Sequence, residues 1–303
     1  MDSMAMNLIP SFSFSCSGST AHMVTSSYWG DYSGTYRISN TGGKSTVTLD
    51  YPPYIRILAA HTNPALENQL TSREKSALRE AQRLTKKLRP SDGNRFEHLV
   101  NIHDYIVKEY KTDLQGSDFA TDLLLDECGA CWAHSRAFYL LARMGGIPCH
   151  IVNGHAGGTA HSWNIIQMNN GEWYHLDTTW DDPITRGGDA GDTIEYHRYF
   201  LVCDNHLSRT HSWNRTPFPK SGSNHATYFV NRNLVFHNSA DFWEAARNAF
   251  YRGKFEFEGW MSPFNENEFR AGMKKLLQED DNMRSCGWIA PKGAEGSVRV
   301  LFN

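Results

Sequence analysis

The spacing of hydrophobic positions predicts three helices in the first half of the chain. Thr71 followed by Glu74 is the pattern of a capping box, which begins a helix, and Pro90 ends that helix. Ser91 or Asp92 caps the next one, whose apolar residues recur at helical spacing. The predicted helices cover residues 72–88, roughly 92–110, and 131 to about 144.

The next part of the chain alternates apolar and polar residues and predicts antiparallel strands. If residues 169–171 form a three-residue loop, Met168 lies opposite Glu172, and His161 opposite Thr179. Asp177 then lies diagonally from His161 on the same face of the sheet. A two-residue loop would place the two side chains on opposite faces. The predicted strands are 148–154, 161–168, 172–180 and 197–204.

The flanking regions have other patterns. Residues 1–26 are rich in Ser, Met and Gly without periodicity, and the Pro- and Ser-rich stretch 216–224 is typical of a boundary. We therefore predict a loose arm over 1–26, a β-hairpin region packing on the core over 27–60, the core over 61–215, and a small α+β extension over 216–303. Further elements are a hairpin at 34–51 and one at 226–236, helices at 241–253 and 265–278, and strands at 254–261 and 298–302. No internal repeat is recognised.

Composition narrows the class of protein. With 40% hydrophobic residues, 21% charged residues and a net charge of −3 over 303 residues, a folded globular chain is expected, with no nucleic-acid partner and no membrane span. The N-terminus lacks the basic region of a signal peptide, so we expect a cytoplasmic chain, a removed leader or a non-classical route of export. Six cysteines are too few for a disulfide scaffold.

Cys131 is the candidate nucleophile. It lies where the loop Gly129-Ala130 enters a predicted helix, and unpaired N–H groups in a first helical turn stabilise a thiolate there. The same groups could hold an oxyanion. His161 at the head of a strand would serve as the base, and Asp177 in the partner strand would orient its imidazole.

The segments that carry these residues resemble a known family. GACWAHSRAFYLLARMGGIPCHIVNG, then HSWNII, then GEWYHLDTTWDDP are similar to the core of the transglutaminase-like superfamily, whose papain-like members carry Cys, His and Asp in this order. The resemblance includes HLVNIHDYIVKEY and YFLVCDNHLSRTHSW, and extends over roughly residues 91–215. It implies an α+β fold with the nucleophile helix packed on an antiparallel sheet, and a bacterial-type member.

By this resemblance Cys131 is the nucleophile, His161 the general base and acid, and Asp177 the orienting group. Candidate residues of the substrate cleft are Trp132, Trp163 and Tyr110. The substrate would be a protein or peptide, attacked through a thioester, with protease- or amidase-like hydrolysis ranked first. The alternatives are a protein-glutamine transglutaminase or deamidase and, from another class, a non-catalytic interaction module. The C-terminal extension could recruit a protein partner.

The sequence departs from the family at one point and leaves other chemistry open. Bacterial members often carry Gly-Tyr where this chain has Ala133-His134, which affects the groove beside the thiol. Cys128 and Cys131 form a CxxC pattern, typical of a redox pair or half a zinc site, but no second CxxC follows. The acidic end of DTTWDDP is compatible with calcium or with a turn. We expect no metal and no cofactor. We also expect His134, His150, His155 and His175 to be structural or solvent-facing.

Overall fold

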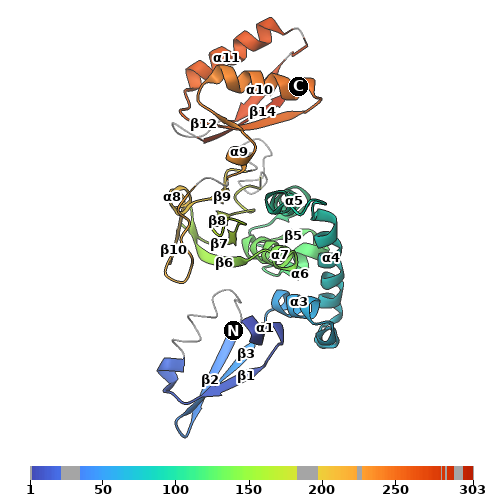
Figure 1. Ribbon diagram of the computed structural model, residues 1–303, viewed down its shortest axis with the longest axis vertical. Coiled ribbons are helices and arrows are strands. Elements are labelled where there is room, and N and C mark those ends of the chain that lie inside the picture. Colours follow the sequence, from blue (N-terminus) through green and yellow to red (C-terminus); the bar gives the residue numbers. More distant parts are fainter. Residues whose placement is uncertain are drawn as a thin grey trace. The chain divides into compact units, whose positions relative to one another are not determined.

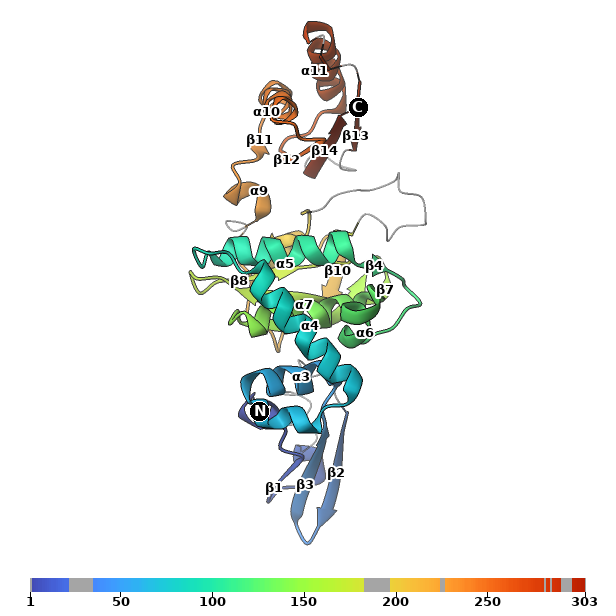
Figure 2. The same ribbon diagram turned by 90° about the vertical axis from the view of Figure 1, so that its right-hand side faces the viewer.

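The computed structural model describes residues 2–21, 35–182, 197–223, 227–280, 282–283, 285–289 and 296–302. The chain divides into two compact units (Figures 1 and 2). The first contains residues 1–179 and 203–222, and the second contains residues 180–202 and 223–303. Each unit combines helices with antiparallel strands, so the predicted α+β class is confirmed.

The first unit begins with a small sheet. The predicted hairpin is confirmed as β2 (Thr35–Thr41) and β3 (Lys44–Asp50). The loose arm predicted for residues 1–26 differs from the structure, because β1 (Ser11–Phe14) pairs with β3 and α1 (Asp2–Met6) precedes it. The four-residue alternation Ser-Phe-Ser-Phe is a strand pattern too short to stand out. Residues 22–34, where the arm was expected to meet the hairpin region, lie outside the described residues.

Helices form the middle of this unit. At the start of α4, Thr71 Oγ1 accepts the N–H of Glu74 at 3.2 Å, and the Glu74 carboxylate accepts the N–H of Thr71 at 2.7 Å, which confirms the capping box. The cap predicted for α5 is wrong, because Asn94 Oδ1 accepts the N–H of Glu97 at 3.3 Å and the helix begins after it. The helices are α3 (Pro53–Thr62), the 3-10 helix η2 (Pro64–Gln69), α4 (Ser72–Leu88), α5 (Arg95–Glu109), α6 (Ala120–Asp126), α7 (Cys131–Met144) and α8 (Asp204–Leu207).

An antiparallel sheet lies against α7 (Figure 1). Its strands run in the order β10 (His211–Trp213), β6 (Cys149–Ala156), β7 (Thr159–Gln167) and β8 (Trp173–Leu176). Gln167 pairs with Trp173, and the N–H of Met168 donates to the carbonyl of Glu172 at 2.9 Å. The three-residue loop and its register are therefore confirmed.

A short parallel pair precedes α7. It joins β4 (Lys111–Thr112) to β5 (Cys128–Gly129) and so ties the end of α5 to the loop before Cys131. Figure 2 shows α4, α5 and α7 on one side of the sheet. The large apolar side chains of these helices are buried, so this layer is the core that positions the site.

The second unit has its own core. Helices α10 (Ser239–Tyr251) and α11 (Glu266–Glu279) pack on a sheet ordered β11-β12-β14-β13, around Phe242, Trp243 and Phe269 (Figure 1). The hairpin predicted at 226–236 is wrong, because Thr227 Oγ1 accepts the N–H of Val230 at 3.4 Å and caps a short helix. The remaining elements are β9 (Phe200–Val202), α9 (Tyr228–Asn231), β11 (Val235–Phe236), β12 (Glu256–Met261), β13 (Cys286–Ile289) and β14 (Gly296–Phe302). No helix of the described residues has both the length and the apolar composition needed to cross a membrane.

Candidate active site

Cys131 is the first residue of α7, and the preceding loop holds it there. The N–H of Asp113 donates to the carbonyl of Gly129 at 3.0 Å, and the N–H of Ala130 donates to that of Ser117 at 2.9 Å. A Cβ on Gly129 would lie 2.6 Å from that of Ala133, so this approach requires glycine. Ala130 has no side chain that could cap the helix, which leaves first-turn N–H groups for an anion.

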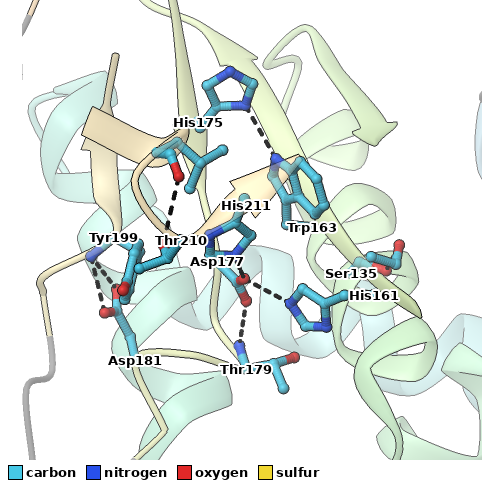
Figure 3. Close-up of polar contacts among 12 residues, drawn as sticks. Ser135, His161, Trp163, His175, Asp177, Thr179, Asp181, Tyr199, Thr210 and His211 are labelled. Atoms are coloured by element: carbon cyan, nitrogen blue, oxygen red, sulfur yellow. Dashed lines mark hydrogen bonds and ion pairs between the residues drawn. The ribbon is translucent and has the colours of Figure 1, made fainter. Parts of the chain in front are cut away.

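His161 and Asp177 form a buried pair on the sheet (Figure 3). His161 lies in β7, and Asp177 is the residue after β8. The Nε2 atom of His161 lies 2.7 Å from Oδ2 of Asp177, and the two residues are 6% and 1% exposed. The register placed these side chains on one face, as the loop length predicted.

The charges around His161 favour its protonated form. Burial alone lowers the pKa of His161, but the charge and hydrogen bond of Asp177 raise it to about 10, with smaller contributions from a hydrogen bond to Cys131 and the charge of Cys131. Burial likewise raises the pKa of Asp177, but His161 and His211 hold it well below its usual range. Because Nε2 of His161 faces Asp177, the Nδ1 atom is left for the sulfur. The structure thus brings the three predicted residues together.

Asp177 also binds a second histidine, which the sequence interpretation missed. Nε2 of His211, in β10, lies 3.0 Å from the same Oδ2 atom, and the N–H of Thr179 donates to Oδ1 at 3.0 Å (Figure 3). A signal for His211 exists, because the tripeptide His-Ser-Trp occurs both at 161–163 and at 211–213. These copies lie on strands that pair with β6 from opposite sides.

The ring of Trp163 packs against both histidines that contact Asp177. It is 1% exposed, its ring stacks on that of His161 with centroids 6.0 Å apart, and it meets the ring of His211 edge-on at 5.0 Å. Its Nε1–H donates to Nδ1 of His175 at 3.1 Å, and Nε2 of His175 then donates to Asp204 at 2.9 Å (Figure 3 shows the first bond). Trp163 is therefore a packing partner of the cluster in this structure.

The other two predicted cleft residues lie at different depths. Trp132, the second residue of α7, is partly exposed, with the Arg136 guanidinium 5.0 Å from its ring centre. Tyr110 is 3% exposed and packs edge-on against Tyr105 at 5.5 Å. The roles of Trp132 and Tyr110 in a substrate cleft stay predictions.

Hydrogen bonds fix α7 against β7. Ser135 Oγ and Ser162 Oγ lie 2.8 Å apart, and Asn164 Nδ2 donates to the carbonyl of Ser135 at 3.0 Å. His134 is completely buried, with Nε2 3.2 Å from Thr112 Oγ1, and burial lowers its pKa to about 4. A neutral His134 in this place agrees with the structural role expected for it.

The same cluster contains the donor atoms of a possible metal site. His161, Asp177 and His211 each offer one ligand atom, all within 4.8 Å of one another. The donor set of two imidazoles and a carboxylate suits zinc, but the hydrogen bonds already satisfy these atoms. Asp181, in the acidic end of DTTWDDP, accepts the N–H of Tyr199, 18 residues further along the chain, at 2.9 Å. All six cysteines lie in the described residues and are free thiols, Cys128 and Cys131 included.

Part of the chain is similar to known proteins. No curated protein matches the chain. Among solved structures, a TGase matches with 13% identity, a TM-score of 0.31 and coverage of 55% of this chain and 49% of that one. The periplasmic domain of TgpA from Pseudomonas aeruginosa bound to ethylmercury matches with 16% identity and a TM-score of 0.30, and the match covers 45% of this chain and 55% of that one. Calcium-bound LapG from Legionella pneumophila matches with 12% identity and a TM-score of 0.32, and the match covers 58% of this chain and 98% of that one.

This chain therefore spans about half the length of the first two of these structures. The match to a family model covers a defined part of the sequence, residues 65–178, which includes Cys131, His161 and Asp177. The model is that of the transglutaminase-like superfamily, so residues 65–178 of the chain are similar to that superfamily.

Proposed function

We propose that the chain is a cysteine-dependent acyl-transfer enzyme in which Cys131, His161 and Asp177 form the catalytic triad. The observation that carries this proposal is the arrangement of one imidazole between a buried carboxylate at 2.7 Å and a thiol at a helix N-terminus. A histidine whose pKa is raised to about 10 is protonated at neutral pH, which supports a thiolate–imidazolium pair. The superfamily includes cysteine-dependent enzymes, in agreement with this chemistry.

The reaction begins with attack by the sulfur. The thiolate of Cys131 forms a bond to the carbonyl carbon of an amide, and the N–H groups at the start of α7 stabilise the oxyanion. His161 then gives its Nδ1 proton to the leaving nitrogen as the C–N bond breaks, and a thioester remains. Next, His161 takes a proton from water as the water oxygen attacks the thioester carbon. The C–S bond then breaks, which releases the acid and returns the thiolate of Cys131 beside the imidazolium of His161. Throughout, Asp177 holds the imidazole through Nε2.

We rank hydrolysis of peptide or carboxamide bonds first. The second candidate is transfer to an amine, as in a protein-glutamine transglutaminase, or deamidation by water. All three reactions share the acylation step, so the triad supports them equally. The partly exposed Trp132 beside the thiol fits a protein or peptide substrate better than a small polar one.

The test has two stages. Iodoacetamide at neutral pH should alkylate Cys131 well ahead of the other five thiols, and His161→Gln should remove this advantage. Equal, slow labelling of all six would favour the non-catalytic interaction module. Cys128→Ser is the matched control, because it removes the CxxC pair and should leave Cys131 fast. Loss of fast labelling in Cys128→Ser would favour a thiol–disulfide protein instead.

The second stage separates the acyl acceptors. Ammonia release from a glutamine peptide is measured with and without a primary amine, next to cleavage of peptide bonds. Cleavage supports the first ranking, whereas incorporation of the amine would favour the transglutaminase. The second unit is proposed to bind a protein partner. Pull-down with the full chain, compared with a chain that lacks residues 223–303 of this unit, would test that role.

A further inference from the structure

One carboxylate oxygen serves two imidazoles in this site. Oδ2 of Asp177 accepts from Nε2 of His161 at 2.7 Å and from Nε2 of His211 at 3.0 Å (Figure 3). The other oxygen, Oδ1, accepts the N–H of Thr179 at 3.0 Å. Because that backbone bond already orients the carboxylate, a second imidazole on Oδ2 does more than hold it in place.

His211 is fixed in this position by its surroundings. Its side chain is fully buried, and its Nδ1 lies 2.8 Å from Thr210 Oγ1. In the ladder between β10 and β6, His211 pairs with Ala156, and Trp213 pairs with Gly154. A Cβ on Gly154 would lie 2.8 Å from the Trp163 ring and 2.3 Å from the carbonyl oxygen of Ser212. Glycine there lets β10 and the two tryptophans close around the cluster.

We propose that His211 is a positioning residue that limits the proton affinity of His161, because the two compete for Oδ2 of Asp177. This inference rests on the proposed acyl-transfer function. When His161 is neutral, the carboxylate keeps its full charge, and the bond from His211 is strongest. When His161 is protonated, the same oxygen is already shared with a cation, and that bond weakens. His211 therefore stabilises the neutral form of His161 more than the charged form.

The effect matters at the moment of bond cleavage. As the C–N bond breaks, its electron pair goes to nitrogen, which takes the Nδ1 proton of His161 while the oxyanion returns to a carbonyl. If Asp177 held the imidazolium alone, the imidazolium would be a weaker acid and would give up that proton more slowly. Sharing Oδ2 keeps the imidazolium acidic enough for a poor leaving group such as an amine.

The other titratable groups around the two imidazoles lie on elements other than β10. His161 faces Asp177 after β8 and Cys131 at the start of α7, and the charges of His161 and Asp177 act on buried His134 in the same helix. His211 faces Asp177 and lies close enough to His175, in β8, for its charge to lower the pKa of His175. A change in the titration of His161 in a His211 variant therefore reports the shared oxygen.

The first test measures the titration of His161 directly. The full chain is labelled with 15N-histidine, and the His161 signals, assigned with His161→Gln, are followed against pH. His211→Phe and His211→Leu both remove the N–H donor, so whichever keeps the wild-type circular dichroism carries the test. We expect the pKa of His161 to rise by about one unit, since part of a charge-assisted hydrogen bond is lost. An unchanged or lower pKa of His161 would overturn the inference.

Two control variants separate the loss of the N–H donor from a general effect on the sheet. His211→Gln keeps an amide N–H donor near Nε2 and should shift the pKa of His161 by less than half as much. His150→Phe changes a half-buried histidine that packs on Trp173 in the same sheet, and should leave His161 unchanged. A shift in His150→Phe as large as in His211→Phe would assign the effect to the sheet and overturn the inference.

The second test uses leaving groups. In His211→Phe, hydrolysis of an anilide substrate should fall about tenfold more than that of the matching p-nitrophenyl ester, since only the amine needs a strong acid. Equal losses would indicate a merely structural role. The spectrum of His161 requires no turnover, so a chain without acyl-transfer activity would contradict the proposed function and leave the first test to decide the inference.

Discussion

Two histidines on neighbouring strands of one sheet, His161 and His175, each pair with a carboxylate and differ in charge. Nε2 of His161 lies 2.7 Å from Asp177, and Nε2 of His175 lies 2.9 Å from Asp204. The pKa of His161 is raised to about 10, mostly by Asp177 against the opposing effect of burial. In contrast, burial lowers the pKa of His175, and Asp204 only partly offsets this. Two similar contacts with a carboxylate therefore give an imidazolium at His161 and a neutral imidazole at His175.

The neighbour of the second nitrogen explains the difference. Nδ1 of His175 accepts the indole N–H of Trp163, so a proton on that atom would break a buried hydrogen bond. His161 instead has Cys131 as a neighbour, whose negative charge favours a proton. The carboxylates differ too, because the side chain of Asp177 is 1% exposed and that of Asp204 is 20% exposed. A His–Asp contact alone therefore does not identify acid–base chemistry.

The largest expected effect separates the two histidines by activity. His161→Gln should lower kcat/KM by about 10³-fold or more, since it removes the general acid and base. His175→Gln should cost less than about tenfold, because His175 acts only through the packing of Trp163. Both are measured on the same peptide substrate, with circular dichroism as a check of folding. Similar losses in the two variants would contradict the different roles of His161 and His175.

The carboxylates should follow the same order with a smaller difference. Asp177→Asn should lower kcat/KM by about 100-fold, because the imidazolium loses its charged partner. Asp204→Asn keeps an acceptor for His175 and should change the rate by less than about threefold. Steady-state rates at pH 7 compare the two variants, and an Asp204→Asn loss equal to that of Asp177→Asn would contradict the assignment.

Trp163→Phe tests why His175 is neutral. The change keeps a ring against His161 but removes the N–H that Nδ1 of His175 accepts. We expect the pKa of His175 to rise, and the free energy of unfolding to fall by about 1 kcal/mol for the lost hydrogen bond. Histidine NMR titration and urea unfolding measure the two quantities. An unchanged pKa of His175 would show that burial alone keeps it neutral.

The smallest effect is a difference in pH dependence of stability. The folded-state pKa of His161 lies above 6.5. The stability that protonated His161 contributes to the folded state is therefore complete below about pH 6.5 and is lost as pH rises toward 10. The folded-state pKa of His175 lies below 6.5. The stability that neutral His175 contributes to the folded state is therefore present above pH 6.5 and is lost as pH falls. The Tm differences between the wild type and each Gln variant should therefore change in opposite directions with pH. Parallel changes would argue against opposite charge states.

The sequence predicted the elements with strong local signals. The capping box of α4, the start of α7 at Cys131 and the three-residue loop after β7 were all confirmed. These depend on contacts within a few residues, which a sequence pattern contains. The same loop length also predicted that His161 and Asp177 share a face, and the structure places them in hydrogen-bonding contact.

The sequence did not predict contacts made over long separations. His211 meets Asp177 across 34 residues because β10 pairs with the far edge of β6, and no local pattern specifies that pairing. Only the repeated His-Ser-Trp could have signalled it. Helix α9 was missed for the opposite reason, because one Thr227 cap outweighs the strand preference of aromatic and β-branched residues.

The shared oxygen of Asp177 has a consequence for the order in which the chain is made. The three side chains that meet there come from β7, from the end of β8 and from β10, which is the last of them to be synthesised. A nascent chain that has not yet reached residue 213 would carry the sulfur and its imidazole without the second histidine. Maturation of the site would then coincide with the addition of that edge strand.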